Sequence, residues 1–549
     1  MTVREQAFSY THGLGATPLL GETIGANFER TVARFGEREA LVSCQEGVRL
    51  TYAALAAAVD RVASGLLGAG LEKGDRVGIW APNCAEWVLL QYASAKVGAV
   101  LVNINPAYRT HELEYALRQA GVRVLVSAPA FKTSDYVAMV GEVREGLPAL
   151  ERVVFLGSAE WDALAETPID TEALGARAAS LSFDDPINIQ YTSGTTGFPK
   201  GATLSHHNIL NNGFYVTELL GFTEADRVCL PVPFYHCFGM VMGNLGATTH
   251  GACIVIPAPS FEPGATLAAV AAERCTALYG VPMMFIAQLA HPDLATLDIS
   301  SLRTGIMAGS PCPIEVMRRV VEEMGMGEVA ICYGMTETSP VSTQTRRDDT
   351  LERRVATVGR AGPHVEVKVV DPATGLGVPR GEPGELCTRG YSVMLGYWND
   401  PERTAEAIDA AGWMHTGDLA TMDDEGYLNI VGRIKDMVIR GGENIYPREI
   451  EEFLYTHPDI VDVQVVGVPD DRFGEELCAW VRLREGASLE EEDVREVCRR
   501  RLAHFKVPRY VIFAEEFPMT VTGKVQKFKM REAAIERLGL AVAAATRSA

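Results

Sequence analysis

The sequence lacks the cysteine patterns that cross-link small secreted domains or hold zinc. Its 11 cysteines, from Cys44 to Cys498, form no CxxC pair and no cluster with histidine, and a chain of 549 residues needs no disulfides to bury a core. It also lacks a run of about 18 apolar residues, a signal segment and a fixed-period repeat. These absences predict a reduced, cytoplasmic protein without structural zinc and without integral membrane association.

The sequence has fewer basic than acidic residues. The chain has 50 Lys and Arg against 71 Asp and Glu, a formal net charge of −21, which repels nucleic acid and anionic membrane surfaces. Hydrophobic residues make up 47% of the chain, enough to bury a large core. We therefore expect a globular protein with small-molecule substrates, in which local groups hold any anionic ligand.

Helical periodicity alternates with short β-branched runs through most of the chain. One helical face consists of Tyr52, Leu55, Val59, Val62 and Leu66. Strand candidates are the runs 76–80, 122–126, 152–156 and 252–256. Strands separated by helix-compatible segments favour sheets covered by helices. The predicted fold class is α/β, with a large N-terminal domain of layered α/β subdomains.

The last part of the chain is predicted to form a separate unit. Pro447 opens an amphipathic helix, the alternation of Val461, Val463 and Val465 indicates a strand, and residues 478–483 are a further strand candidate. These features favour a small α+β domain. We place the boundary near residues 432–435, which gives domains 1–432 and 433–549.

A segment rich in glycine and hydroxyl groups follows the strand predicted at 187–191. Its residues are Thr192, Ser193, Gly194, Thr195, Thr196, Gly197, Phe198, Pro199, Lys200 and Gly201. Backbone amides beside glycine, hydroxyl donors and one lysine suit a phosphate ligand. The segment is not a Walker A loop, because Pro199 precedes Lys200 and Gly201 follows it. A surface loop without a ligand is the alternative.

This segment resembles the phosphate-binding signature of the adenylate-forming superfamily of acyl-CoA synthetases, firefly luciferases and peptide-synthetase adenylation domains. Four further segments resemble that superfamily in its order: 333–337 (YGMTE), 413–418 (WMHTGD), 432–436 (GRIKD) and 518–524 (PMTVTGK). The resemblance covers residues 50–531.

The resemblance implies which residues bind ATP. The implied nucleotide-binding residues are Thr192, Ser193, Gly194, Thr195, Thr196, Lys200, Gly309, Ser310, Pro311, Tyr333, Gly334, Asp418 and Arg433. Asp418 would accept hydrogen bonds from both ribose hydroxyls, since a carboxylate can take two donors, and Arg433 would approach the same ribose. Thr336 is an implied catalytic residue at the phosphates, and Glu337 would hold Mg²⁺.

Three residues of the C-terminal part carry the remaining implied roles. Lys524 is a catalytic residue by resemblance: the family's lysine bridges the substrate carboxylate and the α-phosphate. Lys435 lies at the family's hinge position, and Gly442 would give the pantetheine arm of coenzyme A room to pass. The small domain is therefore expected to be mobile. A solvated lysine and a simple β-turn are the alternatives for isolated residues of these kinds.

The segment 233–240 (PFYHCFGM) resembles the family's element beside the substrate carboxylate. It makes His236 the third implied catalytic residue, with a core histidine as the alternative. Gly239, Met242, Gly243 and Gly246 are expected to help open an apolar channel. Because residues 229–246 contain no acid to receive an ammonium group, a fatty acid is favoured over an amino acid.

The resemblance thus implies an acid–thiol ligase, most similar to the medium-chain type of fatty acyl-CoA synthetase, that uses ATP, Mg²⁺ and coenzyme A. It would form acyl-AMP and pyrophosphate, and then acyl-CoA and AMP. Alternatives are transfer to a carrier protein, ligation of an aryl or other small carboxylic acid, luciferase-like oxygenation and a nucleotide-binding pseudoenzyme. Chain length stays open, as does the oligomeric state, for which a homodimer is one option.

Overall fold

The computed structural model describes residues 7–192, 199–310, 312–441, 443–520 and 525–540. Its contacts divide it into two compact units. The larger unit comprises residues 11–367 and 387–415, and the smaller unit comprises residues 1–10, 368–386 and 416–549. The smaller unit therefore contains all of the predicted domain 433–549 together with three earlier segments.

A seven-stranded sheet in the larger unit has the order β21–β11–β10–β5–β4–β6–β9. Its strands are β4 (Arg76–Trp80), β5 (Val100–Asn103), β6 (Val124–Ser127), β9 (Arg152–Phe155), β10 (Pro186–Thr192), β11 (Lys200–Ser205) and β21 (Gly396–Tyr397). The strands from β10 to β9 are parallel, whereas β11 and β21 pair antiparallel. The strands predicted at 76–80, 122–126, 152–156 and 187–191 are confirmed within two residues at each end.

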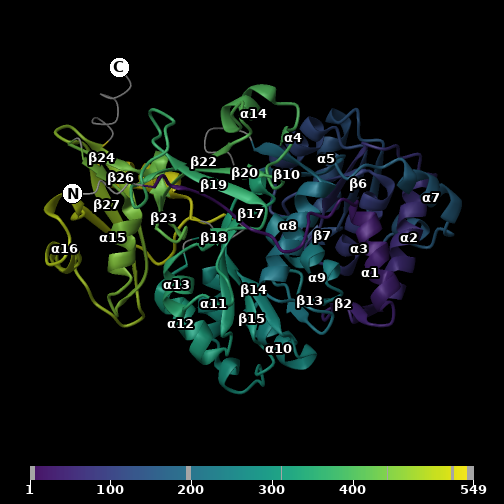
Figure 1. Ribbon diagram of the computed structural model, residues 1–549, viewed down its shortest axis with the longest axis horizontal. Coiled ribbons are helices and arrows are strands. Elements are labelled where there is room, and N and C mark those ends of the chain that lie inside the picture. Colours follow the sequence, from purple (N-terminus) through teal and green to yellow (C-terminus); the bar gives the residue numbers. More distant parts are fainter. Residues whose placement is uncertain (1–6, 193–198, 311, 442, 521–524, 541–549) are drawn as a thin grey trace. The chain divides into compact units, whose positions relative to one another are not determined.

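Helices α2 (Tyr52–Gly68) and α3 (Ala85–Val97) pack together beside this sheet (Figure 1). The hydroxyl of Thr51 caps α2 by accepting a hydrogen bond from the amide of Ala54. The predicted apolar face of α2 is fully buried, from Tyr52 to Leu66. The 3.6-residue period of the sequence thus identified both the helix and its buried side.

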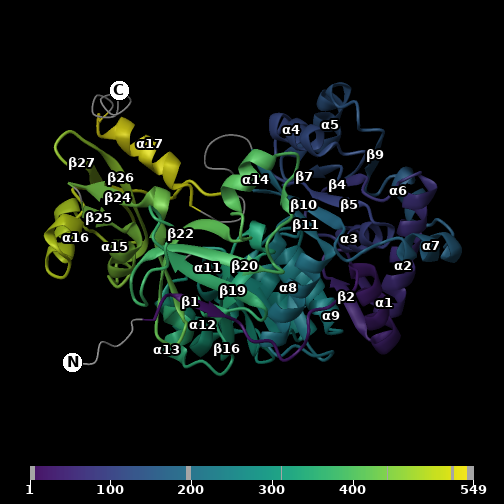
Figure 2. The same cartoon turned by 45° about the horizontal axis from the view of Figure 1, so that its top comes forward.

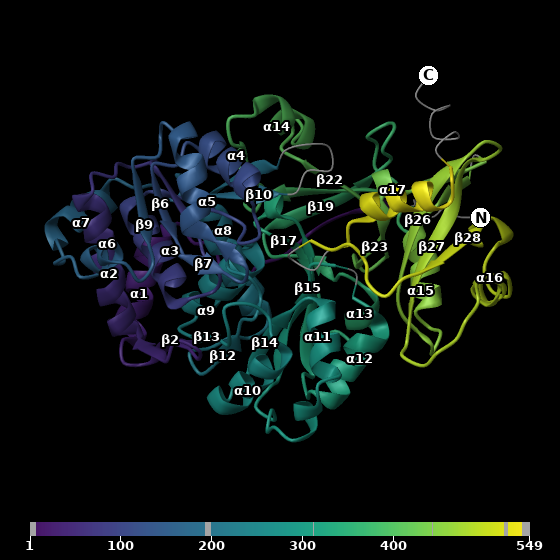
Figure 3. The ribbon, with the colours of Figure 1, turned by 180° about the vertical axis from the view of Figure 1, so that it is seen from behind.

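A nine-stranded sheet in the same unit has the order β18–β17–β16–β15–β14–β12–β13–β2–β3. Its strands are β2 (Glu39–Ser43), β3 (Val48–Thr51), β12 (Arg227–Cys229), β13 (Cys253–Ile256), β14 (Ala277–Gly280), β15 (Thr304–Ala308), β16 (Glu328–Gly334), β17 (Val341–Gln344) and β18 (Arg360–Ala361). The strands from β16 to β2 are parallel. Helices α10 (Pro263–Glu273), α11 (Pro282–Leu289) and α12 (Ile314–Glu323) lie beside it (Figure 3).

The remaining helices complete the larger unit. They are α1 (Ile24–Phe35), α4 (Thr110–Ala120), α5 (Tyr136–Val143), α6 (Ala159–Ala165), α7 (Thr171–Ala179), α8 (His206–Leu219), α9 (Gly246–Thr249), α13 (Leu351–Ala356) and α14 (Pro401–Ala407). A π-helix, η2 (Phe238–Leu245), runs directly into α9. Figure 2 shows α4 and α5 side by side. The short strands β7 (Ala130–Phe131) and β8 (Ser134–Asp135) pair antiparallel.

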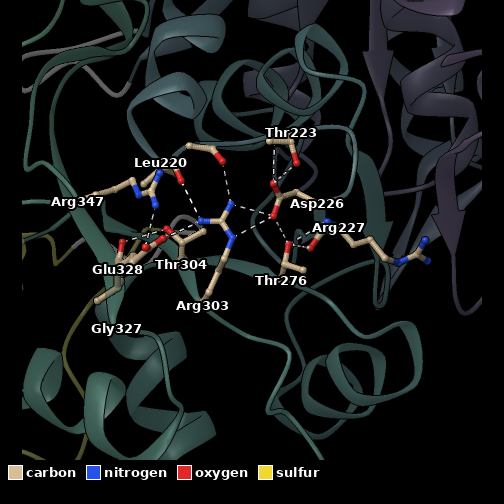
Figure 4. A network of polar contacts seen from close by, with 12 residues as sticks. Leu220, Thr223, Asp226, Arg227, Thr276, Arg303, Thr304, Gly327, Glu328 and Arg347 are labelled. Carbon is tan, nitrogen blue, oxygen red and sulfur yellow. Dashed lines mark hydrogen bonds and ion pairs between the residues drawn. The ribbon is translucent and has the colours of Figure 1, made fainter. Parts of the chain in front are cut away.

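A polar network joins the amino-terminal ends of the parallel strands in the nine-stranded sheet (Figure 4). The Arg303 guanidinium donates to Asp226 Oδ1 at 2.9 Å and to Glu328 Oε2 at 2.8 Å. It also donates to the backbone carbonyls of Leu220 and Gly221, both at 3.1 Å. Because Arg303 precedes β15 and Glu328 begins β16, the network fixes these two strands against each other.

The third sheet has the order β1–β19–β20–β22–β23. Its strands are β1 (Tyr10–His12), β19 (Val365–Val370), β20 (Gly384–Gly390), β22 (Met414–Met422) and β23 (Leu428–Arg433). The hairpin of β22 and β23 belongs mostly to the smaller unit and pairs Asp418 with Arg433.

The smaller unit also contains a sheet that is covered on both faces (Figure 3). Its strands are β24 (Val438–Arg440), β25 (Glu443–Ile445), β26 (Ile460–Asp470), β27 (Gly474–Leu483) and β28 (Tyr510–Phe513). Val463 and Val465 face a core with α15 (Pro447–Leu454) and α16 (Glu491–Arg499), whereas Val466 and Val468 pack with α17 (Lys527–Arg537). The two-residue alternation of a strand explains the two cores, and the predicted α+β composition is confirmed.

Within the described part of the chain, no helix combines the length and the apolar character that crossing a bilayer requires.

Replacing Arg303 with methionine should destabilise the protein. The side chain of Asp226 is only 6% exposed, and losing charged donors to a buried carboxylate costs about 1–3 kcal/mol of unfolding free energy. The measurement is the midpoint of urea denaturation. Arg347→Met is the matched control, since Arg347 also pairs with Glu328 but is 47% exposed, and its loss should cost under about 0.5 kcal/mol. Equal losses in both variants would contradict the assigned role of the network.

Candidate active site

The ends of β10 and β11 meet in the seven-stranded sheet. Their antiparallel pairing places Thr192, the last residue of β10, opposite Lys200, the first residue of β11. The hydroxyl of Tyr115 donates to the carbonyl of Pro199 at 3.1 Å. Two of the predicted phosphate-binding residues, Thr192 and Lys200, are thus neighbours.

The carboxylate of Glu337 lies beside this pair. Glu337 belongs to the short helix η4 (Thr336–Thr338) that follows β16, and it is only 5% exposed. Its Oε1 accepts hydrogen bonds from Tyr397 Oη at 2.9 Å and from Thr192 Oγ1 at 3.4 Å. Among the described residues no donor contacts Oε2, so this hard carboxylate oxygen suits a Mg²⁺ ion.

Tyr397 connects Glu337 with Lys200. The Lys200 Nζ lies 4.8 Å from the centre of the Tyr397 ring, within the range of a cation–π contact. Burial first, and the Glu337 charge second, raise the pKa of Tyr397 well above its ordinary value, so the phenol stays a neutral donor. No sequence motif pointed to Tyr397; only the pairing of β21 with β11 brings it to this site.

Two predicted nucleotide-binding residues, Gly309 and Tyr333, lie at the carboxyl ends of two parallel strands. Strand β15 ends at Ala308, opposite Cys332 of β16, so Gly309 and Tyr333 emerge at the same edge. Ligands of α/β sheets bind at such edges. A Cβ atom on Gly334 would lie 1.9 Å from the carbonyl oxygen of Pro340, which leaves room only for glycine.

His236 lies close to Thr336, with Cys237 between them. Cys237 Sγ is 3.7 Å from His236 Nδ1 and 3.7 Å from Thr336 Oγ1. The amide of Phe238 donates to His236 Nδ1 at 3.1 Å, which places the proton of the neutral imidazole on Nε2. The structure therefore brings together two of the predicted catalytic residues, His236 and Thr336.

The glycines of η2 do not provide the open space expected of them. A Cβ atom on Gly239 would lie 2.6 Å from the Pro233 carbonyl oxygen, and one on Gly243 would lie 2.6 Å from Leu230 Cδ1. Both positions are buried against these neighbours. The two glycines therefore allow η2 to pack closely and add no open space at their own Cβ positions; the apolar channel itself stays a prediction.

In the smaller unit, Asp418 and Arg433 face each other across β22 and β23. Arg433 Nε lies 3.0 Å from Asp418 Oδ1, and the side chains are 50% and 14% exposed, respectively. Lys435 follows in the short helix η5 (Ile434–Asp436). Its burial first, and the Arg433 charge second, lower the pKa of its ammonium group. The predicted ribose-binding pair is thus an ion pair.

Several predicted site residues lie outside the residues that the structure describes. They are Ser193, Gly194, Thr195, Thr196, Pro311, Gly442 and Lys524. Ser310 is described and follows Gly309, whose φ of +94° favours glycine.

Most of the sequence is similar to known enzymes. Residues 28–398 match the family described as AMP-binding enzyme, and residues 449–524 match the AMP-binding enzyme C-terminal domain. The chain belongs to the AMP-binding enzyme family. This membership confirms the resemblance to the adenylate-forming superfamily that the ordered motifs indicated.

Individual relatives of this AMP-binding enzyme cover nearly all of it. YngI of Bacillus subtilis (strain 168), named as an acyl-CoA synthetase, is 49% identical, over 95% of this chain and 99% of YngI. The mitochondrial medium-chain acyl-CoA ligase ACSF2 of Danio rerio is 47% identical, over 97% of this chain and 91% of its own. The anthranilate CoA ligase AuaEII, solved with anthranoyl-AMP, has a TM-score of 0.86 at 28% identity, over 94% and 98%. The predicted α/β fold class is confirmed.

Gly239→Ala should destabilise this AMP-binding enzyme, because the added methyl group would collide with the backbone carbonyl of Pro233. Overpacking of this kind costs about 1–3 kcal/mol, which thermal denaturation would detect. Gly141→Ala is the matched control: Gly141 lies in α5, and a Cβ atom there meets nothing within 4 Å, so that variant should be as stable as the parent or more so. A Gly239→Ala protein of unchanged stability would contradict the close packing of η2.

Proposed function

We propose that this AMP-binding enzyme is an ATP-dependent acyl-CoA synthetase that acts on medium-chain fatty acids. In the first half-reaction, a carboxylate oxygen attacks the α-phosphorus of ATP, and pyrophosphate leaves. In the second, the thiolate of coenzyme A attacks the acyl carbonyl of acyl-AMP, and AMP leaves. The observation that carries the proposal is the meeting of Thr192, Lys200 and Glu337 at one end of the sheet.

The larger unit would bind the phosphates and the acid. Lys200 would supply a point charge and Thr192 a hydroxyl donor to the phosphates, and the carboxylate of Glu337 would hold Mg²⁺. When bound, this ion neutralises charge on the phosphate oxygens. The Nε2–H of His236 would donate to the incoming carboxylate, and the hydroxyl of Thr336 to the α-phosphate.

The smaller unit would supply the residues that bind the ribose of ATP and those that act in adenylation and in thioester formation. Asp418 accepts hydrogen bonds from the ribose hydroxyls, and Arg433 stays beside the same sugar. Lys524 bridges the carboxylate and the α-phosphate during adenylation. Rotation about Lys435 would then bring Gly442 to the pantetheine arm. We propose that domain 433–549 moves against domain 1–432 between the half-reactions.

One observation supports medium-chain acids, and a second supports a fatty acid over an amino acid. The name of ACSF2 assigns medium-chain acids to that protein, and the segment 229–246 contains no carboxylate that could receive an amino group. An aryl acid is the second candidate, because AuaEII is an anthranilate ligase.

We also propose that the protein works in the cytoplasm. All 11 cysteines are free thiols, as is usual in a reducing compartment.

Lys524→Ala should slow adenylation by about a hundredfold, because a charge that acts in the transition state is lost. Thioester formation from supplied acyl-AMP should change far less. Pyrophosphate release and acyl-CoA formation from acyl-AMP are the two assays. Lys529→Ala, an exposed lysine of α17, is the control and should leave both rates unchanged. Equal loss in both half-reactions would contradict the role of Lys524.

The chain length of the acid can be read from turnover with ATP, Mg²⁺ and coenzyme A. Each methylene buried in an apolar channel contributes about 0.8 kcal/mol, or about fourfold in kcat/KM. We expect kcat/KM to rise from acetate to a maximum near octanoate, and AMP release to require coenzyme A. A maximum with benzoate or anthranilate would favour the aryl acid. Pyrophosphate release that coenzyme A does not stimulate would instead indicate a carrier protein or an oxygenase.

A further inference from the structure

One tyrosine side chain contacts two groups of the proposed ATP site at once. The Tyr397 hydroxyl donates to Glu337 Oε1 at 2.9 Å, and the Lys200 ammonium lies 4.8 Å from the centre of the Tyr397 ring. The side chain is 9% exposed. The hydroxyl at the edge of the ring therefore contacts the Glu337 carboxylate, and the face of the ring contacts the Lys200 ammonium group.

The backbone holds Tyr397 firmly in this position. Strand β21 pairs Tyr397 with Ala202 of β11, and the amide of Trp398 donates to the carbonyl of Gly201 at 2.7 Å. The amide of Tyr397 itself donates to Thr404 Oγ1 at 2.9 Å. Since β11 begins at Lys200, the strand that carries the ring is fixed to the strand that carries the ammonium.

The two contacts orient their partners by different physical means. A hydrogen bond to one carboxylate oxygen fixes the rotation of the carboxylate, so that Oε2 of Glu337 keeps one direction for a metal ion. The negative face of an aromatic ring attracts an ammonium group. Because the phenol is neutral, it restrains both Glu337 and Lys200 without adding charge to a site that must accept ATP.

We propose that Tyr397 is a positioning residue for the nucleotide. Its hydroxyl orients the Mg²⁺-binding carboxylate of Glu337, and its ring orients the phosphate-binding ammonium of Lys200. This inference rests on the proposed function, and its two parts are separable, because phenylalanine keeps the ring and loses only the hydroxyl.

The test compares Tyr397→Phe and Tyr397→Leu by calorimetry of ATP binding without any acid, at increasing Mg²⁺ and also in EDTA. Tyr397→Phe should raise the Mg²⁺ concentration for half-maximal ATP binding about tenfold, and should change the affinity for metal-free ATP by less than twofold. Tyr397→Leu should show the same Mg²⁺ effect and also weaken metal-free ATP binding about threefold to fivefold.

Tyr215→Phe is the matched control. Tyr215 is a buried tyrosine of α8 whose hydroxyl donates to the carbonyl of Thr17 at 2.8 Å. It loses one hydrogen bond in the same way but should leave both ATP affinities unchanged. A Tyr397→Phe protein that shifts the Mg²⁺ requirement no more than this control would overturn the proposal.

A double-mutant cycle tests whether the hydroxyl acts through the carboxylate. In a Glu337→Gln background, Tyr397→Phe should have no further effect on the Mg²⁺ requirement; two effects that add would overturn the inference. A Tyr397→Phe protein that fails to fold would also overturn it, since Tyr397 would then serve the fold. If the parent protein shows no Mg²⁺-dependent ATP binding, it is the proposed function that fails.

Discussion

A carboxylate removed from water is the constraint on which the site in the larger unit depends. Glu337 is 5% exposed, and a buried charge is tolerated only with hydrogen-bond donors or a counter-ion. Thr192 and Tyr397 donate to it, and Lys200 lies beyond the ring. These three residues lie on β10, β21 and β11, so the buried charge requires that all three strands be correctly paired.

In the nine-stranded sheet, the residues that stabilise the strands and the residues predicted to bind the nucleotide lie at opposite ends of the strands. At the amino ends of its parallel strands, Arg303 uses all three guanidinium nitrogens in bonds to Asp226, Glu328 and two carbonyls. At the carboxyl ends, the chain turns through Gly309 and Gly334, which leave backbone exposed to a ligand. Because the network fixes the strands at their amino ends, the chain can turn at glycine at the opposite ends without loss of register.

Much of the fold was predictable from the sequence, because periodicity is a local property. The helix that begins at Tyr52, the strand at 76–80 and the helix that begins at Pro447 all follow from the spacing of apolar residues and from proline. The ordered motifs identified the family, and the structure brings Thr192, Lys200 and Glu337 together, although their roles in catalysis stay predictions.

Long-range contacts and packing were not predictable. Strand β21 has two residues and no period, so nothing in the sequence linked Tyr397 to Glu337. Segments 7–10 and 368–386 join the smaller unit through contacts that no local pattern encodes. Gly239 and Gly243 were interpreted as open space, whereas a missing side chain in a dense interior lets neighbouring atoms approach. The nine-stranded and the seven-stranded sheets of the larger unit each end, on one side, in a strand of only two residues, β18 and β21 respectively. Strands this short offer few unpaired amides and carbonyls to another molecule, so those edges resist the edge-to-edge joining of sheets that begins aggregation.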